Sequence, residues 1–152
     1  MSPQLIQMWY KTYRTSIYRF ALSLLRDPQQ AEDVLQETFV KLLTGKFHAP
    51  IPGKEKAWLF RVARNLCLDI LRKRETERTL SPEIAPPPGE NWDFIELISP
   101  LTPSEQEILS LKFIGGLTHK EIAKVTGITV HASKKRYERA IQRLRDEMEV
   151  TP

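Results

Sequence analysis

The chain has 152 residues, of which 41% are hydrophobic and 28% charged, so we expect a water-soluble globular protein of one ordinary domain or two small ones. It has no run of about 18 apolar residues that could cross a bilayer, and its start lacks the apolar core of a signal peptide, so we expect a cytoplasmic protein without membrane insertion. The single cysteine, Cys67, excludes an intramolecular disulfide, and the histidines at 48, 119 and 131 lack metal-ligand spacing, so no metal or cofactor is expected.

The net charge of +4 is distributed unevenly along the chain. Residues 1–75 carry 13 Lys or Arg and 7 Asp or Glu, residues 76–100 carry 1 and 5, and residues 101–152 carry 9 and 7. The resulting charges of +6, −4 and +2 place basic ends on either side of an acidic middle. Basic ends favour a polyanionic partner, although the same charges also promote solubility.

Two amphipathic helices are predicted before Gly45. Apolar residues between Leu5 and Leu25 recur at steps of three and four, which is the period of an amphipathic helix. Asp27 and Pro28 then supply an N-cap and a first residue for the second helix, and Gly45 is its expected stop. The buried stripe of this second helix is predicted to consist of Ala31, Val34, Leu35, Phe39, Leu42 and Leu43.

A loop and a third helix are predicted next. Residues 46–54 contain two prolines and a glycine, which cannot continue a helix. Helical spacing resumes from Lys56 to about Arg74, with a basic exposed side. Within this helix we expect Cys67 to be buried, and we interpret Trp58 as a core residue rather than a platform for base stacking.

The acidic, proline-rich segment 76–91 predicts an extended linker, because three successive prolines favour polyproline II and exclude helix. It separates predicted domains at 1–75 and 92–152. In the second domain we expect a short helix over 92–98 and another that begins at Thr102 with a capping box. Strand-like alternation is missing from the sequence, so the predicted fold class is all-α, with two small helical domains.

The most specific pattern is a helix-turn-helix in the second domain. Thr118 opens a short helix through a capping box, Gly127 suits a left-handed turn, and Thr129 can cap the final helix. Lys and Arg side chains can meet phosphates and guanine edges in the major groove, so the pattern favours DNA binding. The alternative is a three-helix bundle with a solvated basic face. The basic residues of the final helix are Lys134, Lys135, Arg136, Arg139 and Arg143.

This C-terminal half resembles region four of the extracytoplasmic-function (ECF) sigma factors of the sigma-70 family, the domain that recognises the minus-thirty-five promoter element. The resemblance rests on LTPSEQEIL from Leu101, GLTHKEIA from Gly116, GITV from Gly127 and the pair Arg139–Ala140. Taken alone, this half is also similar to the tails of response regulators.

The N-terminal half favours the sigma factors. AEDVLQETF from Ala31 resembles region 2.2 of the family, and AWLFRVARNLCLDILRKR from Ala57 resembles regions 2.3 and 2.4. The resemblance implies a non-enzymatic sigma factor that binds core RNA polymerase and directs promoter-specific initiation of transcription. It assigns region 2 to residues 1–75 and region 4 to residues 92–152.

Residues on the polar face of the second helix are implied to bind the polymerase. The resemblance identifies the partner as the coiled-coil clamp of the largest catalytic subunit, and a solvated face is the alternative. The predicted residues are Asp33, Gln36, Glu37 and Lys41.

The loop after the second helix and the start of the third are implied to capture an unstacked base of the minus-ten element. Stacking surfaces, hydrogen bonds to base edges and cations near the backbone hold single-stranded DNA. Pro50 and Pro52 are unusual for the family, so the identity of the captured base does not carry over. The predicted residues are Phe47, His48, Lys54, Lys56, Phe60, Arg61, Arg64, Asn65, Arg72 and Lys73.

Residues of the final helix are implied to contact the minus-thirty-five element. The chain has His131, Ala132 and Ser133 where the family commonly has Gly, Thr and a branched apolar residue. Ser133 either weakens the packing of the helix or bonds through its hydroxyl to the backbone one turn earlier. The predicted contact residues are Thr129, His131, Lys134, Lys135, Arg136 and Arg139.

The resemblance also implies an anti-sigma factor as a partner, although no residue identifies it. A stand-alone helix-turn-helix regulator and a protein-interaction module without DNA function are the alternatives. The linker is hypothesised to imitate nucleic acid inside the polymerase. An enzyme is not expected, because the sequence offers no nucleophile–base pair, phosphate-binding glycine loop or metal cluster.

Overall fold

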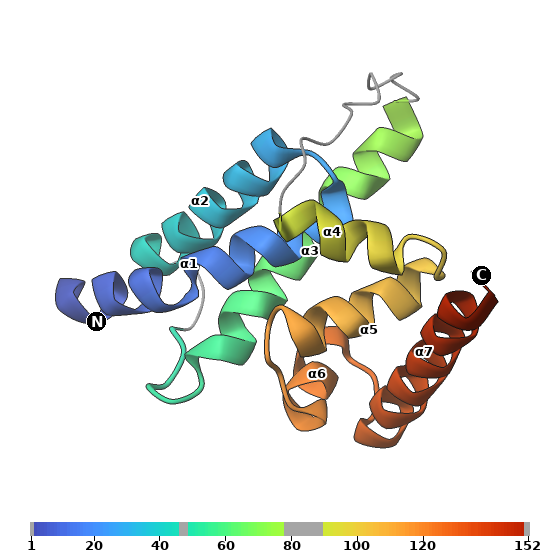
Figure 1. Ribbon diagram of the computed structural model, residues 1–152. Coiled ribbons are helices and arrows are strands. Elements are labelled where there is room, and N and C mark those ends of the chain that lie inside the picture. Colours follow the sequence, from blue (N-terminus) through green and yellow to red (C-terminus); the bar gives the residue numbers. More distant parts are fainter. Residues whose placement is uncertain (1, 46–48, 78–89, 151–152) are drawn as a thin grey trace. The chain divides into compact units, whose positions relative to one another are not determined.

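The computed structural model describes residues 2–45, 49–77 and 90–150, without the side chains of residues 90, 91 and 150. The described residues form seven α-helices and no strand, which confirms the predicted all-α class (Figure 1). The helices are α1 (Pro3–Leu25), α2 (Pro28–Thr44), α3 (Glu55–Glu77), α4 (Glu90–Ile98), α5 (Pro103–Phe113), α6 (His119–Thr126) and α7 (Val130–Val150).

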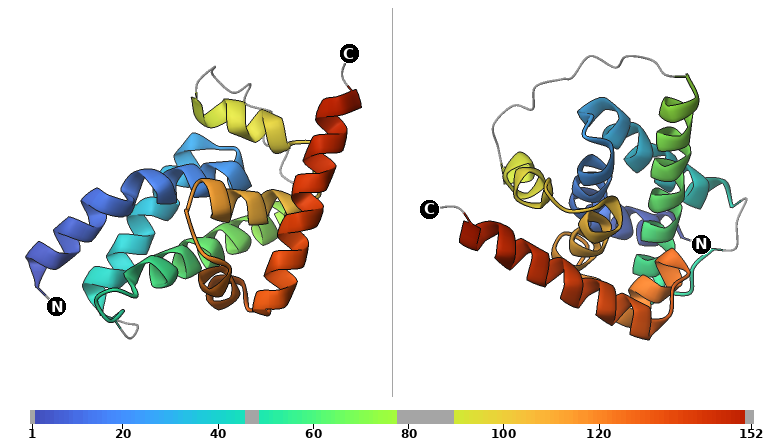
Figure 2. Two further views of the ribbon diagram at one scale, coloured as in Figure 1. Left: turned by 60° about the horizontal axis from the view of Figure 1, so that its bottom comes forward. Right: turned by 90° about the vertical axis from the view of Figure 1, so that its right-hand side faces the viewer.

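The chain divides into two units, Met1–Ala85 and Pro86–Pro152. In the first unit α1 packs against α2 and α3, which also contact each other, and in the second α7 packs against α5 and α6 (Figure 2). Most of the predicted linker, residues 78–89, lies outside the described residues. α3 extends to Glu77 and α4 begins at Glu90, so the first two and last two residues of the predicted linker belong to helices.

The junction between α1 and α2 follows from its local sequence. Arg26 adopts the left-handed conformation, with φ of 54°, and its N–H donates to the carbonyl of Leu22 at 2.8 Å. The carboxylate of Asp27 then accepts from the backbone N–H groups of Gln29 and Gln30 at 2.9 and 3.2 Å. These bonds satisfy donors that a helix start leaves free, so the predicted N-cap is confirmed.

The core of the first unit lies between α1, α2 and α3. The rings of Phe20 and Phe60 meet edge to face with centroids 5.5 Å apart, and both side chains are fully buried. Cys67 is fully buried as expected. At the far end of α3, Arg74 donates to the carbonyl of Leu25 at 2.9 Å and to the side-chain oxygen of Gln30, which ties this end to the α1–α2 junction.

One residue of the predicted α2 stripe is placed wrongly. Leu43 is 64% exposed, whereas Val34, Leu35, Phe39 and Leu42 are buried. The buried residues surround one helix face, and the 100° turn from Leu42 to Leu43 moves Leu43 off that face. Helical periodicity alone placed Leu43 in the buried stripe, because Leu43 follows Phe39 by four residues.

The second unit contains the predicted capping boxes. The hydroxyl of Thr102 accepts from Glu105 N–H at 3.3 Å, and the Glu105 carboxylate accepts from Thr102 N–H at 2.9 Å. Thr118 and Glu121 repeat the arrangement at the start of α6, at 3.1 and 2.9 Å. Each box satisfies two backbone donors, so both helix starts are fixed by four adjacent residues.

Candidate nucleic-acid interface

The helix-turn-helix of the second unit is formed by α6, a short turn and α7. Gly127 has φ of 81°, which favours glycine, and its N–H donates to the carbonyl of Ala123 at 2.9 Å. The hydroxyl of Thr129 accepts from Ala132 N–H at 3.0 Å, so Thr129 caps α7 as predicted. The figures show α6 leading through this turn into the N-terminal end of α7 (Figures 1 and 2).

Ser133 joins these two helices through its side chain. It has no exposed surface, and its Oγ lies 2.8 Å from Nδ1 of His119. The two interpretations of Ser133 from the sequence, weaker packing or a bond to the backbone one turn earlier, did not include His119, which lies fourteen residues earlier in the sequence. Tyr137 packs beside the pair, with its ring centroid 5.5 Å from that of His119. A polar pair therefore occupies the contact between α6 and the first turns of α7.

A groove runs between the start of α5 and the basic side of α7. Its lining contains four of the residues predicted to contact DNA together with the polar start of α5. Lys134 and Thr129 are exposed but do not line the groove, so the structure divides the predicted set between two surfaces. The lining residues are Thr102, Ser104, Glu105, His131, Ala132, Lys135, Arg136 and Arg139.

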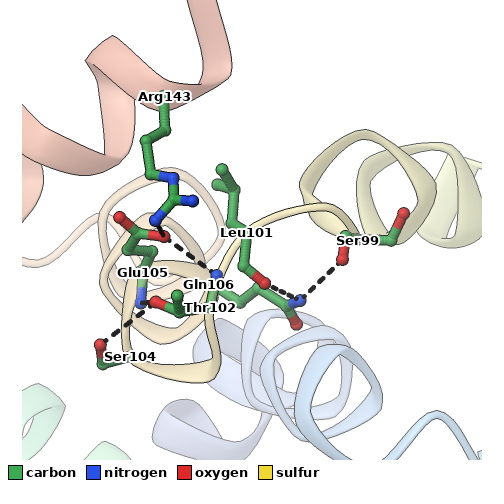
Figure 3. Close-up of polar contacts among 7 residues, drawn as sticks. All are labelled: Ser99, Leu101, Thr102, Ser104, Glu105, Gln106 and Arg143. Carbon is green, nitrogen blue, oxygen red and sulfur yellow. Dashed lines mark hydrogen bonds and ion pairs between the residues drawn. The ribbon is translucent and has the colours of Figure 1, made fainter. Parts of the chain in front are cut away.

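Polar contacts hold one wall of this groove. The Glu105 carboxylate, which accepts from Thr102 N–H at the start of α5, also lies 3.6 Å from a guanidinium nitrogen of Arg143 (Figure 3). Glu105 therefore links α5 to α7. The side-chain amide of Gln106 donates to the carbonyls of Ser99 and Leu101 at 3.3 and 2.9 Å, which fixes the segment before α5 (Figure 3). The start of α5 is thus fastened to α7 and to the chain before it.

The exposed side of α2 carries the residues predicted to bind the polymerase. Asp33, Gln36 and Glu37 are exposed, and Lys41 is half-buried with its ammonium 4.0 Å from Glu37. Sequence reasoning missed Val40, which is 45% exposed on the same side. With the exposed Leu43 nearby, this surface combines acidic and apolar groups. Val40 follows Asp33 by seven residues, about two helical turns, and this spacing was the available signal for Val40.

The predicted minus-ten residues that the structure describes occupy two different environments. Phe47 and His48 lie outside the described residues. Phe60 is fully buried against Phe20, so its side chain has no exposed surface with which to contact DNA. The others have at least partly exposed side chains on or just before α3. The accessible candidates are Lys54, Lys56, Arg61, Arg64, Asn65, Arg72 and Lys73.

A second groove lies between α2 and α3. It is lined by Lys41, Trp58, Arg61, Val62, Asn65, Leu66 and Asp69. Trp58 is half-buried, so the prediction of a core residue holds for only part of the indole. The groove places an aromatic side chain beside cations and an amide, which are the groups that hold single-stranded nucleic acid.

Within the described ranges, no three His, Cys, Asp or Glu side chains gather where they could hold a metal ion. In the same residues, no helix is both long and apolar enough to cross a membrane.

Comparisons with known proteins agree with this arrangement. Residues 9–77 match the model of Sigma-70 region 2, and residues 92–144 match that of Sigma-70, region 4. The ECF RNA polymerase sigma factor SigM of Bacillus subtilis is 33% identical over 148 residues, which cover 90% of each chain. SigX of the same organism is 25% identical and covers 95% of this chain and 84% of its own length.

A solved structure has a similar fold. The sigma factor RpoE of Bartonella quintana, crystallised with the anti-sigma factor NepR, matches with a TM-score of 0.79 and 25% identity. The match covers 96% of this chain and 98% of that chain.

Proposed function

Because the chain belongs to the extracytoplasmic-function sigma factors of the sigma-70 family, we propose that its two units contact separate promoter elements. As a sigma factor, it binds core RNA polymerase and directs promoter-specific initiation of transcription. The first unit binds the polymerase and opens the minus-ten element, the linker crosses the polymerase, and the second unit recognises the minus-thirty-five element. The protein acts in the cytoplasm without catalysing a reaction.

The groove between the start of α5 and the basic side of α7 is the main observation that supports the proposal for the second unit. Lys135, Arg136 and Arg139 lie along one side of the helix that follows the turn, and the turn leaves the first residues of α7 exposed. Helix-turn-helix proteins place this part of the second helix in the major groove. Within the groove, Lys135 and Arg139 are then proposed to neutralise phosphates, and His131 and Arg136 lie on either side of them along the face turned to the DNA.

The exposed side of α2 supports a protein contact in the first unit. Asp33 and Glu37 repel DNA, and Val40 and Leu43 expose apolar surface that a partner can bury. This surface therefore suits the polymerase clamp better than the promoter. We propose that an anti-sigma factor is a further partner, since RpoE of Bartonella quintana was crystallised with one.

Run-off transcription with purified bacterial core polymerase and a library of promoter fragments tests this division. We expect defined starts with the wild type, loss of polymerase binding in Asp33→Lys/Gln36→Ala, and weaker promoter binding in Lys135→Ala/Arg139→Ala. The exposed Glu75→Gln and Arg145→Ala variants are controls in the first and second unit, respectively, and should behave as wild type. Duplex binding without any activation of core polymerase would instead support a stand-alone regulator.

A further inference from the structure

The segment before α3 forms a tight turn over Ile51–Lys54. The N–H of Lys54 donates to the carbonyl of Ile51 at 2.8 Å, Pro52 occupies the second position, and Gly53 has φ of 93°. Proline at the second and glycine at the third position are typical of a type II turn. The local sequence therefore determines the shape of this turn but not its attachment to the rest of the unit.

Glu55 supplies that attachment. One carboxylate oxygen accepts from Gly53 N–H at 2.7 Å, and the other accepts from the Tyr13 hydroxyl at 2.9 Å. Tyr13 belongs to α1 and lies 42 residues away in sequence. Hydrogen bonds to a carboxylate are roughly twice as strong as those between neutral groups. Glu55 thus links the turn to α1 while standing in the first turn of α3.

The attached turn presents Ile51 and Lys54 to solvent. Ile51 is 71% exposed although it is a large apolar residue, and the neighbouring Pro50 is buried. An exposed aliphatic side chain beside a lysine offers an unpaired base an apolar contact and its phosphate a cation. Holding both groups in place before DNA arrives lowers the ordering cost of binding.

We infer that Glu55 is a positioning residue that holds the Ile51–Lys54 turn in the conformation in which Ile51 and Lys54 meet the opened minus-ten strand. The inference rests on the proposed role of the first unit at the minus-ten element.

The charge of Glu55 makes the inference testable. Glu55 stands between Lys54 and Lys56, so its negative charge opposes the attraction of these cations for DNA. If Glu55 contributed only charge, its removal would strengthen binding to single-stranded DNA. If it positions the turn, removal weakens that binding, and the two roles predict changes of opposite sign.

The experiment compares Glu55→Ala, Glu55→Gln and Tyr13→Phe with the exposed control Glu75→Ala in the same helix, each as the full chain bound to core polymerase. Two probes are used, a single-stranded oligonucleotide with the non-template minus-ten sequence of an active promoter and a duplex with only its minus-thirty-five element. Unfolding temperature and affinity for core polymerase are measured for every variant.

We expect Glu55→Ala to bind the single strand roughly tenfold more weakly than Glu75→Ala, with unchanged affinity for core polymerase and for the minus-thirty-five duplex. Glu55→Gln should recover most of the loss, because its amide oxygen still accepts from Gly53 and its amide nitrogen faces Tyr13. Tyr13→Phe should give a smaller loss. Ile51→Ser should also weaken single-strand binding without lowering the unfolding temperature.

Binding of Glu55→Ala equal to or tighter than that of Glu75→Ala would overturn the inference, as would a loss that Glu55→Gln does not recover. A general loss of folding would appear in the unfolding temperature and would lower both DNA affinities, which also contradicts a local positioning role. Failure of the wild type to start transcription with core polymerase would overturn the proposed function itself and is seen separately.

Discussion

Ser133 carries a hydroxyl at a position without exposed surface, and that hydroxyl is paired with Nδ1 of His119. Removing one partner of a buried hydrogen bond costs about 1 kcal/mol or more, because the remaining group loses both the bond and water. We therefore expect Ser133→Ala to raise amide hydrogen exchange about fivefold in α6 and α7. Exchange in α1 and α2 of the same sample is the control.

A double-mutant cycle separates this hydrogen bond from other effects. If Ser133→Ala and His119→Ala act through their mutual contact, the double variant should be destabilised by less than the sum of the single variants. Strict additivity of the changes in opening free energy, calculated from the exchange rates of α7, would contradict the pairing.

The protonation of His119 offers a second test at the same site. Partial burial, followed by the nearby charges of Lys112 and Lys134, lowers the pKa of His119 below its usual value of 6.5, although Glu138 acts in the opposite direction. Below pH 6.5 the unfolded chain takes up this proton more readily than the folded chain, so stability falls as the pH drops toward the lowered pKa.

NMR titration of the His119 ring should give a pKa below 6.5. The second unit should lose less stability on acidification in His119→Gln than in the wild type, because the titrating ring is gone. A ring that titrates above its usual value would contradict the burial and charges described around His119.

Gly127 shows how one turn determines the orientation of two helices. A Cβ at this position would meet no atom within 4 Å, so the cost of a side chain comes from the backbone, whose φ is 81°. We expect Gly127→Ala to destabilise the second unit by about 1 kcal/mol, and Gly127→Asn by less, because Asn tolerates the left-handed region better. Chemical denaturation, followed by the indole signal of Trp92, measures the free energy of unfolding of both variants. Equal stabilities of the two variants would contradict this explanation.

Helix starts were predictable because their determinants are local. Asp27, Thr102 and Thr118 each bond to backbone groups within three residues, so four adjacent letters contain the whole interaction. Gly127 likewise takes its φ from its own lack of a side chain. Such features depend little on tertiary structure, and the sequence patterns that encode them were interpreted correctly.

Tertiary partners were less predictable. Tyr13 reaches Glu55 across 42 residues, and His119 reaches Ser133 across fourteen. Phe60 is a different case, because it precedes the buried Ala63 and Cys67 by three and seven residues, and this helical spacing already indicated a buried position. Pairing between distant residues depends on how helices cross, which helical periodicity does not specify.

At the scale of the whole molecule, the basic ends of the chain are divided between two units that each carry a groove with cations. Each phosphate neutralised by a cation releases counterions, so the logarithm of the binding constant falls with the logarithm of salt concentration by about 0.9 per phosphate. The salt dependence of promoter binding therefore counts the phosphate contacts that each unit contributes.

We expect Lys135→Ala/Arg139→Ala to reduce the magnitude of this salt slope by about two for the holoenzyme on a full promoter, because both cations line the groove of α7. Arg145→Ala, which removes an exposed cation elsewhere on α7, should leave the slope unchanged. Fluorescence anisotropy across a salt series measures the slopes. An equal reduction by Arg145→Ala would show that the charge of the helix, rather than this groove, contacts the phosphates.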